Sequence, residues 1–245
     1  MIKIENIEVS GWEAAIRGMR NPMNSWEFID SHVCQSEDKF EDCYGGAVCH
    51  RDEDGISWTQ DVFCVGMNDF ALMKRLAAGG SVHAKYRRMI IVTMDITAPL
   101  YWWKEFDTYK VGTVANSCST MHKIHDKEFT VDDFSHEHIK NFYGFKENPH
   151  GHEVALFENG FRNTIADLNA ARKLYLQTGD KQYWWQMIQL LPTSYNQKRT
   201  VQISYEVAAA LHKDRRHHKL DEWHVICDTL ERLPYAEGII YKIGG

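Results

Sequence analysis

The chain has 245 residues, of which 44% are hydrophobic and 25% charged, a composition typical of a globular protein with a substantial core. The formal net charge of −6 argues against binding to DNA or RNA polymers, because such binding needs a basic face. No apolar run approaches the roughly 20 residues of a membrane span, and the charged amino terminus does not resemble a secretory signal. The six cysteines include no CxxC pair, and a chain of this size does not need disulfides, so we expect a cytoplasmic protein with reduced thiols.

Patterning in the first part of the chain predicts two strands and two helices. Residues 2–9 alternate apolar and polar positions, as a strand does, and residues 12–20 form a helix ended by Asn-Pro. Residues 31–55 show no clear period and are predicted to be irregular. A helix is expected over 68–78, and the β-branched content of 86–96 indicates a buried strand.

The rest of the chain is predicted to be mainly helical. Pro99 opens a helix that continues to Tyr109, because proline is tolerated in a first helical turn. Further helices are expected over 153–177, 181–191, 199–213 and 220–233. No repeat or linker interrupts the chain, so one domain is predicted over residues 1–245. Its fold class is α+β, with a small, twisted, mainly antiparallel sheet in the N-terminal half covered by helices, and a largely helical C-terminal half.

The segment from Pro99 to Lys123 concentrates the residues that suit a ligand. After the predicted helix comes a turn at Gly112, which permits close backbone approach, and Lys110 and Lys123 flank the polar part. The small polar side chains there are Thr113, Asn116, Ser117, Ser119 and Thr120. They predict either a cradle for a small anionic ligand or a polar loop that satisfies its own backbone.

The same segment resembles the RHRxxSxNxxSxR pattern of the flavin-dependent thymidylate synthases. With one inserted residue, Thr108, Tyr109 and Lys110 occupy the triplet and Thr113, Asn116 and Ser119 the later polar positions. Other similar pieces follow in the family's order, namely 14–17, 76–83, 190–195 and 200–202. The resemblance therefore covers most of the chain in thin, collinear pieces.

The resemblance implies an enzyme that methylates C5 of a pyrimidine deoxynucleotide, dUMP or a relative. It implies FAD as cofactor, NADPH and methylenetetrahydrofolate as co-substrates, and a homotetramer. The catalytic residues that it implies are Ser119, Lys110 and Glu105. The cofactor-binding residues are His83, Thr108, Tyr109, Lys110, Thr113, Asn116 and Gln202. The substrate-binding residues are Ser117, Ser119, Lys123 and Arg199.

The sequence departs from the family pattern at its arginines. Met121 stands where the closing arginine is expected, and Lys110 is the only cation left in the triplet. Lysine binds phosphate as a point charge whereas arginine binds it as a fork, so the change is not conservative. Either other cations rebuild the phosphate site, or the substrate is no longer dUMP. The candidate replacements are Lys123, Arg199, Arg215 and Arg216. The alternative hypothesis is a catalytically inactive or repurposed nucleotide-binding or interaction protein on the same fold.

Two further patterns in the sequence have ordinary structural explanations. Histidine pairs recur at 122/125, 136/138, 150/152 and 217/218, but none matches a zinc motif, so no metal site is predicted. The basic run 213–219 is interpreted as a solvated junction between two helices, with a phosphate contact as the second interpretation.

Overall fold

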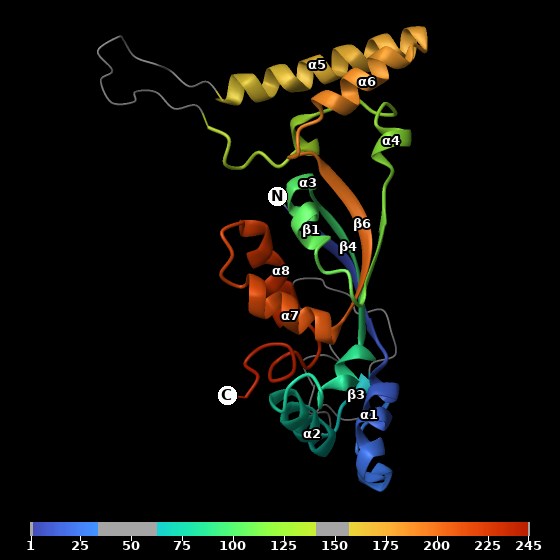
Figure 1. Cartoon of the computed structure of the whole chain (residues 1–245), viewed down its shortest axis with the longest axis vertical. Coiled ribbons are helices and arrows are strands. Elements are labelled where there is room, and N and C mark those ends of the chain that lie inside the picture. The colour runs from blue at the N-terminus through green and yellow to red at the C-terminus, as the bar shows by residue number, and fades with distance from the viewer. Residues whose placement is uncertain (1, 34–62, 141–156, 245) are drawn as a thin grey trace, which may run out of the picture. The chain divides into compact units, whose positions relative to one another are not determined.

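The computed structural model describes residues 2–33, 63–140 and 157–244. Four of its strands form one antiparallel sheet (Figure 1). Its strand order is β1-β4-β6-β5, with bounds β1 Lys3–Ser10, β4 Ile91–Pro99, β6 Asn196–Ser204 and β5 Thr113–Ser117. A separate antiparallel pair joins β2 His32–Val33 to β3 Phe63–Cys64. The α+β fold class is confirmed, although one central strand, β6, comes from the C-terminal half of the chain.

The helices are distributed along the whole chain. They are α1 Trp12–Arg20, α2 Met67–Ala78, α3 Leu100–Phe106, α4 Thr120–Lys123, α5 Phe157–Thr178, α6 Lys181–Leu190, α7 Tyr205–Arg215 and α8 Asp221–Glu231. Short 3-10 helices cover Asn21–Met23, Trp26–Phe28, Lys85–Arg88 and Val131–Asp133.

The described residues form two compact units. The first unit comprises residues up to Lys3, Thr97–Phe106 and Ser117–Lys198, and the second comprises Ile4–Ile96, Asp107–Asn116 and the chain from Arg199 onward. The prediction of one domain over residues 1–245 is not tested by this division and stays a prediction.

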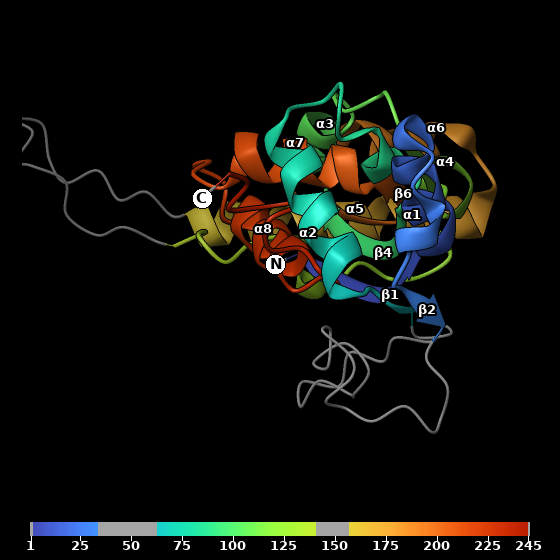
Figure 2. The ribbon, with the colours of Figure 1, turned by 90° about the horizontal axis from the view of Figure 1, so that it is seen from below.

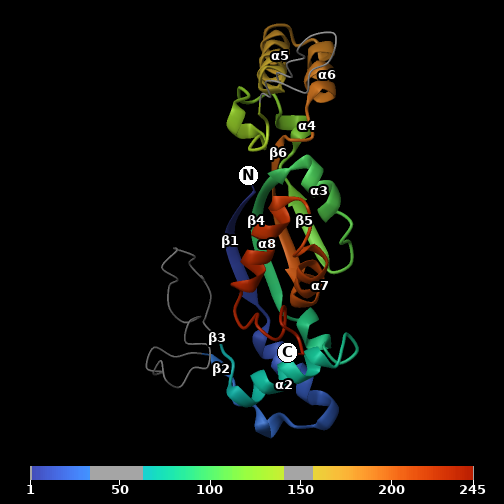
Figure 3. The ribbon, with the colours of Figure 1, turned by 90° about the vertical axis from the view of Figure 1, so that its left-hand side faces the viewer.

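In the second unit, the sheet has one buried face and one polar face. Val201 and Ile203 of β6 are buried, whereas the alternate residues Thr200 and Gln202 are exposed. Helices α7 and α8 cover the buried face (Figure 3). On the polar face Asp95 accepts hydrogen bonds from Asn6 Nδ2 at 2.9 Å and Thr200 Oγ1 at 2.6 Å, joining three neighbouring strands. This alternation is that of an antiparallel sheet with one solvated face.

Helices α1 and α2 of the second unit lie side by side (Figure 2) and share a buried ion pair. Arg20 Nε donates to Asp69 Oδ1 at 2.6 Å, and both side chains are almost wholly buried. Asp69 Oδ2 also accepts from the amides of Asp30 and Ser31, each at 3.1 Å. Asp30 in turn accepts from the amides of Asn68 at 2.8 Å and Asp69 at 3.0 Å, which satisfies the first turn of α2.

The first unit has its own core beneath the antiparallel pair α5 and α6. Buried side chains from these helices and from the preceding segment form it: Ile124, Phe129, Phe134, Ile165, Leu168, Ala171 and Met187. Asn169 of α5 joins the helix to that segment, since its Oδ1 accepts from the Phe129 amide at 2.8 Å and its Nδ2 donates to the Phe129 carbonyl at 2.9 Å.

Several predicted elements occur with nearly the predicted bounds, and three predictions were wrong. The helix expected over 199–213 begins only at Tyr205, because the preceding residues form β6. The strand expected over 86–96 is shifted to Ile91–Pro99, so Pro99 ends a strand rather than entering a helix. The first part of the polar segment, predicted as either a ligand cradle or a polar loop, is instead strand β5, Thr113–Ser117. Most of the stretch predicted to be irregular, 31–55, lies outside the described residues.

Two chemical expectations from the sequence have different outcomes. Cys118 and Cys227 are free, but Cys64 is disulfide-bonded, so the expectation of wholly reduced thiols fails at that position. Among residues 2–33, 63–140 and 157–244, no helix combines the length and apolar character needed to cross a membrane.

Candidate ligand-binding loop and its anchors

The loop between α3 and β5, residues 107–112, is anchored in the second unit by two arginines. Arg199 of β6 donates from NH1 to Asp107 Oδ1 at 2.7 Å, and the Arg199 side chain is only 15% exposed. Arg215 of α7 donates from Nε to the Tyr109 hydroxyl at 3.0 Å. The loop that carries the predicted Thr108, Tyr109 and Lys110 is therefore held at two points by arginines that lie 92 and 106 positions after their partners.

Arg215 also stacks on two aromatic rings. Its guanidinium carbon lies 5.5 Å from the Tyr109 ring centroid and 4.8 Å from that of Trp223 in α8, and the two rings are 6.3 Å apart. Such cation–π contacts strengthen when the groups are partly desolvated. Burial raises the pKa of Tyr109, although Arg215 opposes the shift, so this phenol is a neutral group at physiological pH.

Gly112 brings the end of the loop close to the first turn of α7. Its φ of +77° lies in the left-handed region, and a Cβ there would meet Val207 Cγ2 at 3.1 Å. Ser204 caps the same helix by accepting from the Val207 amide at 3.3 Å. Next in the chain, Thr113 Oγ1 is buried and has no hydrogen-bond partner among the described residues. A buried hydroxyl of this kind is a candidate partner for a ligand or a water.

The predicted polar cradle is divided by the geometry of β5. Successive side chains of a strand point to opposite faces, so Thr113 and Ser117 share one face while Asn116 points to the other. Asn116 and Ser117 are exposed. The polar cluster predicted to follow the turn at Gly112 therefore presents its groups in two directions, because this segment is an extended strand.

In the first unit, Ser119 and Lys123 have structural partners. Ser119 Oγ accepts from the His122 amide at 3.1 Å and caps the single turn of α4. The Lys123 ammonium donates to Asp126 Oδ2 at 2.8 Å, and this hydrogen bond lowers the pKa of the Asp126 carboxyl. Both side chains remain exposed, so their structural roles do not bar a ligand from reaching them.

The remaining predicted residues lie on several different elements. Glu105 is half-buried on α3 in the first unit, whereas Thr108 and Lys110 are exposed in the anchored loop of the second. Gln202 is exposed on β6, and the ring of exposed His83 packs against Gly79. Within the loop, Lys110 is a cation with no ion pair to any described residue. It is therefore the group there most readily available to an anion.

Most cations proposed as replacements for the family's arginines are already paired. Arg199 and Arg215 hold the loop, and Arg216 pairs with Asp228 and with Glu231, the latter at 3.6 Å. Sequence reasoning missed Asp107, which lies 92 residues from its arginine. It also left out Trp223. The only sign of its contact with Arg215 in the sequence was its position in a predicted helix that follows the basic run 213–219.

Within the described residues, no three His, Cys, Asp or Glu side chains converge as metal ligands would. The pair His150/His152 lies outside those residues, as do Cys34, Cys43 and Cys49, whose irregular spacing in the sequence indicates free thiols rather than a zinc site. Two histidines of the predicted pairs lie against neighbouring residues. His136 Nδ1 contacts the Phe134 carbonyl at 2.9 Å, and His125 packs edge-on against Tyr175.

Solved structures similar to this chain share its architecture over nearly their whole length. Flavin-dependent thymidylate synthase ThyX from Helicobacter pylori, complexed with FAD and dUMP, has a TM-score of 0.59 and 14% identity, and covers 98% of each chain. A second structure of that protein with FAD and dUMP has a TM-score of 0.60 and 13% identity, covering 99% of this chain and 98% of that one. The chain has the fold of the flavin-dependent thymidylate synthases.

A further structure with this thymidylate synthase fold is the UMP/dUMP methylase PolB from Streptomyces cacaoi bound with 5-Br dUMP. It has a TM-score of 0.52 and 12% identity, and covers 94% of this chain and 88% of that chain. No protein-family model matches the sequence, and no curated protein matches it significantly. The likeness is thus one of fold, with little sequence identity to accompany it.

Proposed function

We propose that the chain is a diverged flavin-dependent, thymidylate-synthase-like enzyme that binds FAD and methylates C5 of a pyrimidine deoxynucleotide, dUMP or a relative. The observation that carries the proposal is the near-complete overlap with a thymidylate synthase whose structure holds FAD and dUMP. Methylenetetrahydrofolate as one-carbon donor, NADPH as reductant and assembly as a homotetramer are parts of the same proposal.

The residues of the anchored loop are suited to part of an FAD molecule. Lys110 offers a cation for a phosphate, and the buried Thr113 hydroxyl lacks a partner among the described residues. In the proposal Thr108, Tyr109 and Lys110 bind the cofactor together with the groups on other elements: His83, Thr113, Asn116 and Gln202. Bound flavin would supply the hydride chemistry that no amino-acid side chain provides.

For the nucleotide, the proposal uses Ser117, Ser119 and Lys123 of the first unit. Their exposed hydroxyls and ammonium can donate to a phosphate, and Glu105 is assigned the orientation of the base. Arg199 is a weaker candidate than the sequence indicated, because its ion pair with Asp107 must be given up or shared for it to bind phosphate. Lys123 is also ion-paired, with Asp126, but its side chain is exposed and reaches a ligand more readily than that of Arg199.

Product formation tests this proposal directly. The purified chain is incubated anaerobically with dUMP, methylenetetrahydrofolate, FAD and NADPH, and the nucleotide pool is analysed by mass spectrometry. The proposal predicts that dTMP forms, that its formation needs FAD, and that Lys110→Glu reduces it more than Lys104→Glu, an exposed lysine of α3. Absence of any methylated pyrimidine, with UMP as well as dUMP, contradicts the enzymatic proposal.

A second candidate function is nucleotide binding without catalysis. The pairing of Arg199 and Arg215 within the protein favours it, since these arginines hold the loop rather than standing open for phosphate. That function predicts a colourless protein which dUMP stabilises against heat and FAD does not.

A further inference from the structure

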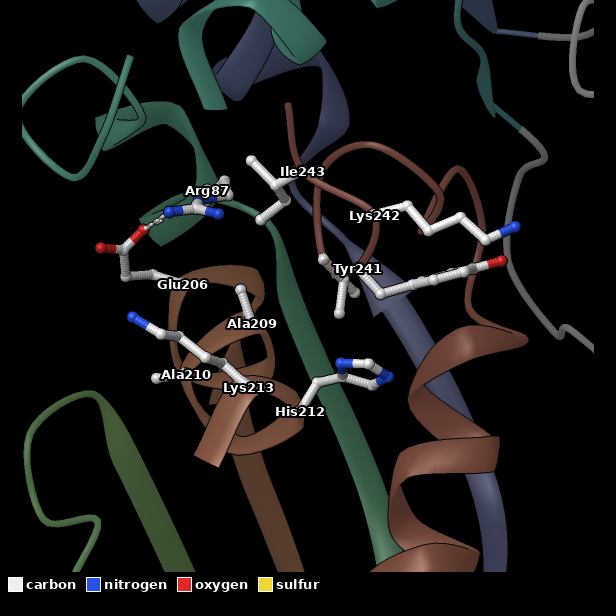
Figure 4. A pocket seen from close by; sticks show the side chains of 10 residues that line it. Arg87, Glu206, Ala209, Ala210, His212, Lys213, Tyr241, Lys242 and Ile243 are labelled. Atoms are coloured by element: carbon white, nitrogen blue, oxygen red, sulfur yellow. Dashed lines mark hydrogen bonds and ion pairs between the residues drawn. The ribbon is translucent and has the colours of Figure 1, made fainter. Parts of the chain in front are cut away.

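Arginine–carboxylate pairs of the second unit differ in how firmly the acid is held. In the pair that Figure 4 shows, Arg87 donates from Nε to Glu206 Oε2 at 2.9 Å and from NH1 to the Ile239 carbonyl at 3.0 Å. Arg87 NH2 lies 2.8 Å from the same Glu206 oxygen, and the two side chains are 8% and 22% exposed. This arginine joins its own 3-10 helix to α7 and to the C-terminal segment, so the pair has a structural role.

The pair of Arg199 and Asp107 is held much less firmly. The Arg199 side chain is 15% exposed, but that of Asp107 is 53% exposed. One hydrogen bond joins them, from NH1 to Oδ1 at 2.7 Å, and the Asp107 side chain has no other hydrogen bond or ion pair to a described residue. An exposed carboxylate turns into water at little cost, whereas a largely buried guanidinium needs an anion beside it. The arrangement is therefore suited to exchange, in which another anion replaces Asp107 at Arg199.

Asp107 opposes a phosphate ligand in two ways. It occupies a donor of Arg199, the arginine predicted to bind substrate, and its own negative charge repels an incoming phosphate. A nucleoside 5′-monophosphate carries close to two negative charges at neutral pH, whereas the parent nucleoside carries none. Both effects therefore weaken the binding of the nucleotide and leave that of the nucleoside unchanged.

From these contacts we infer that Asp107 is a specificity-determining residue that acts through Arg199. It competes with the phosphate of the ligand for the guanidinium, and so sets how strongly the chain prefers dUMP over deoxyuridine. The dUMP part of the inference rests on the proposed function. The competition for Arg199 needs no nucleotide, because any anion that reaches the guanidinium must displace the same carboxylate.

Asp107→Asn tests the inference, because asparagine keeps the size of the side chain and an oxygen for Arg199 NH1 but removes the charge. Isothermal titration calorimetry measures the binding of inorganic pyrophosphate, dUMP and deoxyuridine to the full chain. Asp107→Asn is expected to bind pyrophosphate and dUMP about tenfold more tightly, with a steeper dependence on salt, and deoxyuridine with unchanged affinity. A purely structural pair predicts no gain, since its loss would weaken all three affinities or leave them as they are.

Glu13→Gln is the matched control, because Glu13 pairs with Arg17 of the same unit at 3.6 Å and lies outside the anchored loop. It is expected to change none of the three affinities, and adding Arg199→Gln to Asp107→Asn should cancel the gain. Circular dichroism checks that all variants are folded.

Three results overturn the inference: no gain for pyrophosphate in Asp107→Asn, an equal gain in Glu13→Gln, or a gain that survives Arg199→Gln. An equal gain for deoxyuridine and dUMP overturns the role in specificity. Tighter pyrophosphate binding by a chain that binds no dUMP supports the competition at Arg199 and contradicts the proposed substrate, so the two failures are distinguishable.

Discussion

Replacing Asp69 by asparagine is expected to destabilise the second unit severely, because Asp69 is the only charged partner of buried Arg20 among the described residues. The Asp69 carboxylate is wholly buried and accepts four hydrogen bonds, from Arg20 Nε, the two amides of Asp30 and Ser31, and the Ser31 hydroxyl at 2.6 Å. Asparagine has the same size but no charge, and its NH2 group would face one of these donors. An uncompensated buried charge costs about 3–5 kcal/mol.

Urea unfolding followed by tryptophan fluorescence measures that free energy. Arg17→Ala is the control, since its pair with Glu13 is exposed on the same helix with the charged atoms 3.6 Å apart, and such pairs contribute about 0–1 kcal/mol. Combining Asp69→Asn with Arg20→Leu removes both charges and is expected to recover part of the loss. A loss below about 1 kcal/mol for Asp69→Asn alone would refute the reasoning that this substitution leaves Arg20 as a buried charge without a partner.

Three further substitutions test the loop and the helix entry. Gly112→Ala should lower stability by about 1–2 kcal/mol in urea unfolding, because alanine is strained at positive φ; an unchanged midpoint would contradict the loop conformation. Arg215→Lys keeps the positive charge but loses the planar guanidinium that contacts Tyr109, so it should weaken FAD binding without changing the far-UV circular dichroism spectrum. Unchanged affinity for FAD would show that this contact does not contribute to cofactor binding. Burial raises the pKa of Asp30, but hydrogen bonds from the α2 amides outweigh it, so the pKa is lower in the folded state. The ionised Asp30 carboxylate therefore stabilises the fold above the ordinary carboxyl pKa, and this stabilisation is lost as the pH falls through the lowered pKa. Asp30→Asn should therefore cost about 1 kcal/mol at pH 7 and progressively less below pH 4, and a pH-independent loss would exclude this origin.

Local patterns in the sequence were sufficient for the helices with clear ends. Helix α1 ends before Asn21-Pro22 and α2 ends at Gly79, as predicted, because these signals act within a few residues. The helix predicted over 199–213 failed because its first residues alternate. Val201 and Ile203 are buried between exposed neighbours, which is the period of a strand. That signal was present but was outweighed by the helical pattern that follows.

The candidate site was less predictable than the elements. The sequence drew attention to the correct loop through Gly112 and Lys110, but it assigned Arg199 and Arg215 to a ligand. Which acid or ring meets a given arginine is decided by pairing across strands and helices, here between Arg199 and Asp107, and no local pattern contains that information. The divided cradle of β5 has the same cause, because a short polar segment becomes a strand only when β6 lies beside it.

Flavin binding is the most direct test of the central proposal, that this fold still serves a flavin enzyme. The visible absorption spectrum and melting temperature of the purified chain are recorded before and after addition of FAD. The account predicts retained flavin absorbance after desalting and a higher melting temperature, since a ligand at 100 times its Kd stabilises the folded state by about 2.7 kcal/mol. A folded protein that stays colourless and melts at the same temperature with FAD would contradict the proposal.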